Sequence, residues 1–454
     1  MMIRGLFAGV SFPHWTPMER WCRITASWIG AAGLLACSAS ADSTANDSGT
    51  QQQLHLLQQQ NDALQQQMLR QQEMIENLSR KVAQLESSGG SDKDAPEPAH
   101  SQGGFSTGKL HLSGEGQVGF FNAGSHGQFP NSEFRIDEAK LFVEAQVWND
   151  VYFFSEINLF LREEDEYELR PGELYLDAEN LSQLWGQDRQ LNLRAGRIDI
   201  PFGEEYQTHD AIDNPLVSHS IMNLWGVDEG VELYGALDRF QYVLAVQNGG
   251  HSGLRDFNRD KAVIARVGVD PVKWLHLSVS GMRTGALDVK QDQLSELWLG
   301  SGFVRPLGSA KTTVFRAGLL EGDVQLKLPR TTVKLAGGML QYSDDDPTAD
   351  NGREVYYYYA EGVQKLYGGF YAAVRWSQVF ADKGFPIAGN GNVGTYAFSP
   401  VLTKDLWLLS LGVGYRWSEQ LVFKVEYSLE QGHTINGPDR TAEDLLAVTA
   451  AFAF

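Results

Sequence analysis

The last ten residues, LLAVTAAFAF from Leu445 to Phe454, decide the fold because they alternate residue by residue. A period of two is that of a β-strand, whose successive side chains point to opposite faces of the sheet. One face is wholly apolar and ends on an aromatic residue, as a strand that faces lipid requires. A bilayer satisfies no backbone hydrogen bond, so strands cross it only as a closed barrel. One face carries Leu446, Val448, Ala450, Phe452 and Phe454, and the other carries Leu445, Ala447, Thr449, Ala451 and Ala453.

The composition of the whole chain agrees with a barrel. The chain has 454 residues, of which 47 are glycine and 43% are hydrophobic, and its mean hydropathy is −0.28. No uncharged apolar run long enough for a membrane-spanning helix lies beyond the N-terminal region, which excludes a polytopic helical membrane protein. The length suffices for one large barrel and an appendage.

Residues 1–41 predict an export signal peptide. Arg20 and Arg23 supply a positive start, residues 24–35 form an uncharged and mostly apolar run, and residues 39–41 (ASA) offer a small-residue cleavage site. The apolar run is too short to favour a retained membrane anchor.

Two details of this signal have alternatives. The residues before Met18 fit a signal poorly, so Met18 is a candidate for the true start. Cys37 follows LLA and is a candidate lipoprotein site, which competes with cleavage after residue 41. The one other cysteine is Cys22, so cleavage after residue 41 would leave no thiol. Disulfide and thiolate chemistry are then excluded.

The chain is strongly acidic. Its net charge is −20, and residues 1–41 hold three arginines and one glutamate, a net +2 that leaves −22 after cleavage. Nucleic acid is therefore excluded as a partner. Acidic outward loops would suit a membrane surface where divalent cations bridge lipopolysaccharide, although such loops are also common without a role.

Residues 51–86 predict a coiled coil that precedes the barrel, and residues 87–108 predict a flexible Ser, Gly and Pro rich linker. Eight of the ten seam positions are apolar. A single Gln-rich helix or a disordered spacer is the alternative. A coiled coil needs several chains, so the pattern predicts an oligomer. The a positions are Leu54, Asn61, Met68, Ile75 and Val82, and the d positions are Leu57, Leu64, Gln71, Leu78 and Leu85.

Strand-like segments recur from residue 109 to residue 454, and short and long connections alternate between them. This alternation is typical of an antiparallel transmembrane β-barrel with its short turns in the periplasm. We count 18 segments, among them 294–304. Residues 311–328 are alternatively one long strand, and another merger would give 16. The fold class is therefore all-β, a barrel of 16–18 strands over residues 109–454. Either number leaves an aqueous lumen.

The third long connection, residues 199–228, is the candidate constriction of this lumen. It carries many carboxylates and no Lys or Arg, so an inward position would favour cations or neutral solutes. The alternative is a loop folded over the outside with solvated carboxylates. Its acidic residues are Asp199, Glu204, Glu205, Asp210, Asp213 and Asp228.

Basic residues that the strand alternation places on the inner face of the wall are the other pore-lining candidates. They are interleaved with carboxylates such as Glu138 and Glu156, and a wall of mixed sign sets up a field across a pore. Salt bridges that merely hold the barrel in shape are the alternative. The basic candidates are Arg194, Arg266, Arg375 and Arg416, together with Lys140 and Lys424.

Two patterns in the sequence bear on catalysis or metal binding. His219 beside Ser220, with Asp213 nearby, would indicate a hydrolase. Adjacent strand residues point to opposite faces, however, and no Gly-x-Ser-x-Gly elbow is present. His209 and Asp210 could join Asp213 and His219 around a divalent metal, but thiols and a compact ligand spacing are lacking. We therefore expect no enzyme activity, no metal and no cofactor.

Three segments resemble the phosphate-selective porin O and P family. They are residues 193–206 (LRAGRIDIPFGEEY), 214–220 (NPLVSHS) and 225–235 (WGVDEGVELYG). The resemblance covers about residues 109–454 and implies a trimeric barrel with an inward third loop and passive diffusion of small, often anionic, solutes. Phosphate-selective members have arginines and a lysine-rich constriction. Loop 199–228 has neither, so no phosphate-binding residue is carried over.

These patterns together predict a homotrimeric outer-membrane porin for small hydrophilic solutes or ions, with loop 199–228 setting the constriction. We expect outer-membrane lipid and lipopolysaccharide around it. The coiled coil would lie in the periplasm, where it trimerises or contacts peptidoglycan or a partner protein. The alternative is a structural tether or adhesin that is anchored by the barrel and acts through the coiled coil.

Overall fold

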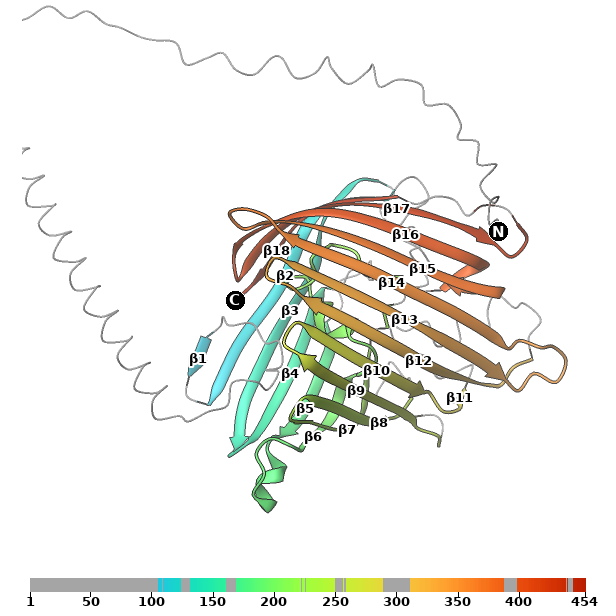
Figure 1. Ribbon diagram of the computed structural model, residues 1–454. Coiled ribbons are helices and arrows are strands. Elements are labelled where there is room, and N and C mark those ends of the chain that lie inside the picture. Colours follow the sequence, from blue (N-terminus) through green and yellow to red (C-terminus); the bar gives the residue numbers. More distant parts are fainter. Residues whose placement is uncertain are drawn as a thin grey trace, which may run out of the picture. The chain divides into compact units, whose positions relative to one another are not determined.

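The computed structural model describes the C-terminal part of the chain, with gaps in several connections (Figure 1). The described residues are 105–107, 109–123, 131–160, 169–221, 223–224, 226–249, 256, 259–288, 311–387, 398–437, 439 and 444–454. The predicted signal peptide (1–41) and coiled coil (51–86) lie outside them. Of the predicted linker, residues 105–107 are described as the short strand β1 (Phe105–Thr107), paired with β2 (Leu110–Asn122).

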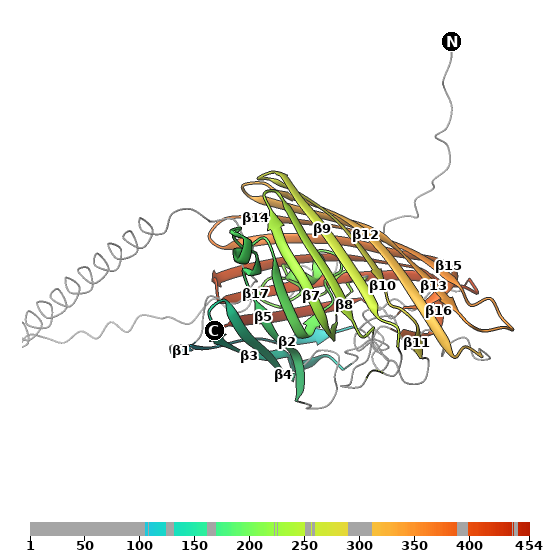
Figure 2. The same cartoon turned by 90° about the horizontal axis from the view of Figure 1, so that it is seen from below.

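The described strands form one closed antiparallel barrel (Figures 1 and 2). The sheet has 18 strands, of which β1 and the two-residue β11 (Leu287–Asp288) are short appendages, so 16 strands make the wall. Besides β2, the wall strands are β3 (Glu133–Trp148), β4 (Val151–Phe160), β5 (Arg170–Ala178), β6 (Asn192–Asp199), β7 (Val227–Leu237), β8 (Phe240–Gln247), β9 (Ala262–Val272), β10 (Leu275–Arg283), β12 (Val314–Lys327), β13 (Thr331–Asp344), β14 (Arg353–Lys365), β15 (Phe370–Ile387), β16 (Phe398–Ser418), β17 (Leu421–Thr434) and β18 (Leu445–Ala453).

The C-terminal strand closes the barrel by pairing with the first wall strand. Its register against β2 runs from Leu446 opposite Asn122 to Ala453 opposite Glu115. The backbone of Phe454 both donates to and accepts from Gly114, at 2.9 and 3.0 Å. The predicted alternation of β18 is confirmed, because its burial alternates residue by residue.

The observed wall strands confirm one alternative in the predicted strand count and show that one predicted strand is wrong. β12 spans both halves of the predicted pair 311–320 and 323–328, so that merger is confirmed. β10 pairs directly with β12 over nine residue pairs, from Leu275 opposite Leu326 to Arg283 opposite Gly318. No wall strand therefore fits between them, and the strand predicted at 294–304 is wrong as a wall strand; these residues lie outside the described ones. Sixteen wall strands is the lower of the two predicted numbers.

Long and short connections alternate around the wall, as predicted. β3 and β4 are joined by two residues, and so are β16 and β17, whereas residues 200–226 join β6 to β7. The connection between β5 and β6 is the exception at the short-turn end, since it holds the 3₁₀ helix η1 (Leu181–Trp185). Residues 200–226, which we call L3, form the third long connection. Within the described residues, no helix is long and apolar enough to cross a membrane.

The outer face of the wall is apolar and bears aromatic side chains near the strand ends. In β16, Leu411 and Val413 are 47% and 52% exposed, whereas Ser410 on the inner face of the same strand is 2% exposed. Trp148, at the end of β3, is 73% exposed. Trp376 and Trp407 stack on neighbouring strands with ring centroids 4.8 Å apart. The predicted assignment of outward and inward residues is therefore confirmed for β16.

Candidate functional site

L3 leaves the wall at the end of β6 and turns into the barrel. Phe202 is buried, and Gly203 adopts a left-handed backbone with φ of 72°. The Gly203 N–H donates to Ser280 Oγ on β10 at 3.0 Å. A Cβ at Gly203 would overlap a carboxylate oxygen of Glu321 on β12. Only glycine therefore combines this backbone with this close approach.

The next residue anchors the loop to two wall strands. A carboxylate oxygen of Glu204 lies 3.2 Å from the Arg266 guanidinium on β9 and 3.3 Å from His276 Nε2 on β10. Burial alone would raise the pKa of Glu204, but the hydrogen bond with His276 and the charge of Arg266 outweigh it, so the pKa lies below its usual value. Glu204 thus stays ionised as an anchor.

The middle of L3 reaches β13 and folds back on itself. The short 3₁₀ helix η2 (Glu205–Thr208) ends on Thr208, whose hydroxyl accepts a hydrogen bond from Lys334 Nζ at 2.9 Å. The Glu205 carboxylate accepts hydrogen bonds from the backbone N–H and the hydroxyl of Ser220. The half-buried Glu205 carboxylate therefore ties two distant parts of L3 together.

Asp210 joins L3 to β3 through a buried ammonium. Lys140 Nζ lies 2.6 Å from Asp210 and 3.1 Å from both Glu115 and Glu138, and its side chain is 4% exposed. These three carboxylates lie close enough together to ligate a cation, but the Lys140 ammonium already holds that position. Burial raises the pKa of Asp210, but the charges of Lys140 and His209 outweigh it and the pKa lies well below its usual value.

The turn after Asp210 is held by Lys424 on β17. Its ammonium donates to the carbonyl oxygens of Ala211, Asn214 and Leu216, at 2.8, 3.3 and 2.9 Å. The Lys424 side chain is 2% exposed. A lysine has three N–H donors, so one side chain satisfies three loop carbonyls that have no sheet partner.

Two further side chains hold the NPLVSHS segment. The Glu426 carboxylate accepts hydrogen bonds from the backbone N–H groups of Val217 and Ser218 and from the Ser218 hydroxyl. The Arg375 guanidinium donates to the Ser218 carbonyl at 2.6 Å and pairs with Glu361. The segment is thus clamped onto β15 and β17 from both sides.

The inner faces of β4 to β7 carry the other charged part of the lumen. Arg194 pairs there with Asp177 at 3.0 Å and with Glu232 at 3.3 Å, and its guanidinium lies over the Tyr175 ring at 4.4 Å. Three half-buried carboxylates accompany them. The half-buried carboxylates on this side are Glu156, Glu173 and Asp199.

The predicted pore residues separate into two groups. Glu204, Asp210, Arg266, Arg375 and Arg416 meet in the contacts between L3 and the wall; Arg416 donates to the Ile212 carbonyl at 2.8 Å. Arg375 is 4% exposed, so it holds the loop and does not face open water.

The remaining predicted residues lie elsewhere. Glu205 bonds within the loop, Arg194 and Asp199 belong to the β4 to β7 side, and Asp213 is exposed. Partial desolvation by the surrounding loop and the charge of the neighbouring Asp210 raise the pKa of Asp213.

Sequence reasoning missed several residues that complete the site. Lys334, His276 and Glu115 contact L3 residues or their partners, yet each comes from a strand far from L3 in the chain. The one sequence signal for these residues is their inward position in the strand alternation. The local sequence does not show which residue lies across the lumen from another.

The hydrolase and metal-site patterns of the sequence receive no positive support from the geometry of the described residues. The Ser220 hydroxyl donates to the Glu205 carboxylate. The rings of His209 and His219 lie with centroids 6.5 Å apart. Asn214 Nδ2 is 3.4 Å from His219 Nδ1. These contacts account for the polar residues as parts of the loop's own framework.

The fold is shared with solved outer-membrane proteins. No protein-family model matches the chain, and no curated protein matches it by sequence. The outer membrane channel DcaP of Acinetobacter baumannii superimposes with a TM-score of 0.51 at 12% identity, covering 76% of this chain and 97% of that one. OmpT of Vibrio cholerae in its trimer form superimposes with a TM-score of 0.50 at 11% identity, covering 76% and 99%. At these identities the likeness establishes the fold, a closed barrel of the outer-membrane type.

Proposed function

We propose that this chain is a bacterial outer-membrane porin through which small hydrophilic solutes or ions diffuse passively, with L3 narrowing the lumen. The observation that carries the proposal is the placement of L3. Its hydrogen bonds reach inward side chains of β3, β9, β10, β13, β15, β16 and β17. A loop held to so many strands of one closed wall restricts the lumen without closing the barrel itself.

The passage in this proposal runs between L3 and the inner faces of β4 to β7. Two of the four carboxylates of L3 pair with wall bases, Glu204 with Arg266 and Asp210 with Lys140, and Glu205 bonds to Ser220 within the loop. Among the described residues, the β4 to β7 side carries five carboxylates and two bases: Arg194, which pairs with Asp177 and Glu232, and Arg170, which lies opposite Asn158. The five carboxylates are Glu156, Glu173, Asp177, Asp199 and Glu232. An excess of carboxylates beside a narrow passage favours cations and neutral solutes.

The finer family assignment rests on the resemblance of residues 193–206, 214–220 and 225–235 to the phosphate-selective porin O and P family. The inward L3 supports a porin of that general design. Phosphate selectivity is not part of the proposal, because Lys140, Lys424 and Arg375 are taken up by L3 itself. We also propose that the chain forms a homotrimer in the outer membrane, joined by a periplasmic coiled coil at residues 51–86.

The reversal potential in a salt gradient tests the proposed passage. Wild-type protein in a planar bilayer should show a cation-selective reversal potential. Replacing two of the three half-buried carboxylates, by Glu156→Gln and Glu173→Gln, should lower the cation-to-anion permeability ratio by at least about fivefold, since ~1 kcal/mol for one charge at about 4 Å in water is a factor of about five. Anion selectivity in the wild type would contradict the acidic passage.

A matched control neutralises one carboxylate outside the lumen. Glu354 faces outward on β14 and bonds to Tyr356. Glu354→Gln should leave the permeability ratio as it is in the wild type. An equal fall in the control and in the double variant would assign selectivity to net charge and not to the β4 to β7 side.

One observation favours the alternative of a barrel-anchored tether. Ile200 and Phe202 of L3 pack in an apolar cluster with inward residues of β8 to β16, among them Leu340. If this cluster seals the lumen, the barrel is an anchor and carries no ion current. Absence of current in the same bilayer experiment would favour the tether.

A further inference from the structure

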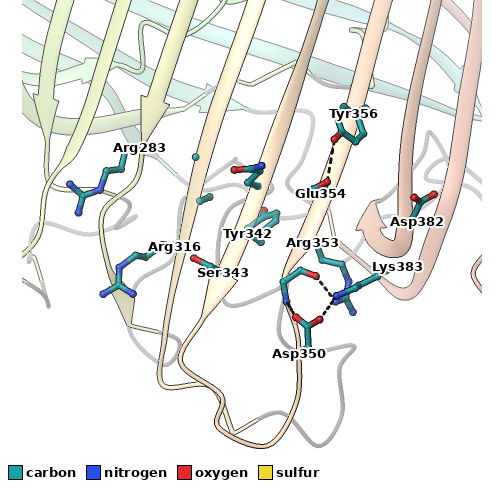
Figure 3. A pocket seen from close by; sticks show the side chains of 14 residues that line it. Arg283, Arg316, Tyr342, Ser343, Asp350, Arg353, Glu354, Tyr356, Asp382 and Lys383 are labelled. Carbon is teal, nitrogen blue, oxygen red and sulfur yellow. Dashed lines mark hydrogen bonds and ion pairs between the residues drawn. The ribbon is translucent and has the colours of Figure 1, made fainter.

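A groove on the outer face of the wall lies at its long-loop end, over β10, β12, β13, β14 and β15. Its volume is about 690 Å³, and Figure 3 shows the side chains that line it. Two arginines, Arg283 and Arg316, stand on one side of it, and Lys383 stands on the other (Figure 3). The groove is separate from L3 and from the proposed passage.

The strand register places both arginines on the outer face. Their neighbours Met282 and Ala317 are buried at 5% and 2% exposure on the inner side, so Arg283 and Arg316 point outward. Arg283 lies opposite Gly318 on β12, and Gly318 lies opposite Gln341 on β13. Arg316 is two residues from Gly318 on the same face of the same strand.

Gly318 leaves the outer face bare beside both arginines. A Cβ built at Gly318 would meet no atom within 4 Å. Every larger side chain would occupy the outer face between Arg283 and Gln341. The glycine therefore leaves room for a group from outside the chain beside both arginines.

The described charges leave this side of the groove basic. Arg283 pairs with Asp260 at 3.0 Å, and its side chain stays 62% exposed. Lys383 pairs with Asp350 at 2.5 Å. The Arg316 guanidinium makes no direct hydrogen bond or ion pair within the described part of the chain, and only its charge acts on Asp260.

The acidic residues of the groove lie toward β14 and β15, away from the arginines. Glu354 accepts a hydrogen bond from the Tyr356 hydroxyl at 3.2 Å, and Asp382 lies on β15 (Figure 3). The Arg353 guanidinium donates to backbone carbonyls, among them that of Gly384. The one described cation without a direct partner in the groove is thus Arg316, next to the gap at Gly318.

The groove lies where the apolar band of the wall meets the long loops. The next outward residue of β12 is Leu320, which is 52% exposed, and it lies opposite Gly281. Tyr356 and Tyr358, outward on β14, are 49% and 41% exposed. Aromatic residues mark the membrane interface in such barrels, and the long loops lie on the extracellular side. A ligand of the groove would therefore have its headgroup at the outer-leaflet surface.

We propose that this groove binds the phosphorylated headgroup of an outer-leaflet glycolipid, with a phosphate between Arg283 and Arg316 above Gly318 and the acyl chains on Leu320. Arginine forms paired hydrogen bonds with phosphate, and two guanidinium groups with Asp260 beside them keep a net positive charge that attracts it. The inference requires the barrel to lie in an outer membrane and does not depend on conduction, so a sealed barrel would leave it intact.

The test counts bound lipid on the purified full-length protein. Protein in detergent is mixed with bisphosphorylated lipid A, and bound lipid is measured by native mass spectrometry. The double variant Arg283→Gln, Arg316→Gln should lose about tenfold or more in lipid A affinity, the effect of removing hydrogen bonds to a charged group. The matched control is Lys327→Gln, Arg330→Gln, which makes the same charge change at the short-turn end of β12, and it should bind as the wild type does.

Further variants and ligands separate the outcomes. Gly318→Leu keeps both arginines and fills the gap, and it should also weaken lipid A binding; heat-shifted gel mobility checks that each variant is folded. Lipid A stripped of its phosphates should bind weakly to the wild type. Undiminished binding to the arginine variant, or an equal loss in the control, overturns the proposal. Displacement of lipid A by millimolar inorganic phosphate would identify a free-phosphate site and overturn the lipid assignment.

Discussion

Lys424 shows how one side chain fixes the position of a loop inside the lumen. Its buried ammonium donates to three carbonyls of L3, at Ala211, Asn214 and Leu216. A charge buried to this extent is tolerated when its donors are satisfied. The three loop carbonyls, in turn, have no neighbouring strand to supply backbone N–H donors. The loop thus satisfies the buried charge of Lys424, and Lys424 holds the loop in place.

Replacing this lysine should release the turn. Lys424→Met keeps much of the side-chain volume but leaves three buried carbonyls without that donor. We expect a loss of about 1.5–3 kcal/mol in stability, the range for hydrogen bonds to a charged group. The measurements are the temperature at which gel mobility shifts and the open-channel noise, which should rise as L3 moves. Lys365→Met, at the exposed end of β14, is the control, and equal effects of the two would contradict the clamp.

The anchors at Glu204 and Asp210 predict how the loop responds to acid. Both groups have a pKa below the usual value, because His276 with Arg266 and Lys140 with His209 outweigh burial. A lowered folded-state pKa gives stabilisation that is complete above the unfolded-state pKa, about 4, and is lost as the pH falls further. Open-channel noise should therefore be constant from about pH 7 to 5 and rise only below about pH 4. A rise between pH 7 and 5.5 would contradict these anchors.

The sequence identified the acidic residues of the site but not their partners. The sequence alone shows that L3 contains several carboxylates and no Lys or Arg. The sequence does not show which basic residues contact L3, because these lie far away in the chain. Lys140 is 70 residues from Asp210, and Lys424 is 213 residues from Ala211. Inward parity named Lys140 and Lys424 as candidates, whereas His276 and Lys334 were missed.

At the scale of elements, L3 depends on the geometry of its entry. Gly203 has a φ of 72° and no room for a Cβ beside Glu321. Gly203→Val should cost at least about 1–2 kcal/mol, the penalty of a left-handed backbone for a branched residue. Thermal unfolding measures it.

A second glycine supplies the control for this change. Gly281 has an ordinary φ, and the nearest atom to its added Cβ lies 4.0 Å away. Gly281→Val should leave stability within about 0.5 kcal/mol, as surface substitutions do. An equal loss at both positions would show that Gly203 has no special role.

Strand alternation predicted the elements well and their pairing less well. A period of two shows that a segment suits a β-strand, as in β16 and β18, where the burial pattern follows the sequence. The period does not show which strand lies alongside. Residues 294–304 carry the pattern, yet β10 pairs directly with β12. The number of wall strands thus depended on pairing, which a local pattern does not contain.

At the scale of the whole molecule, closure distinguishes a barrel from an open sheet. The pairing of β18 with β2 leaves no unpaired edge in the wall, and this is what permits strands in lipid. The alternation of long and short connections then places L3 and the groove with the long loops. The predicted coiled coil at 51–86 lies outside the described residues and stays a prediction.

Single-channel conductance of the wild type and of a loop-shortened variant tests the central claim most directly. The variant replaces residues 204–220 by a short Gly-Ser linker and leaves the wall intact. The account predicts stable conductance steps for the wild type and larger steps for the variant, because L3 narrows an open lumen. A wild-type protein without steps, or two proteins with equal steps, would contradict it.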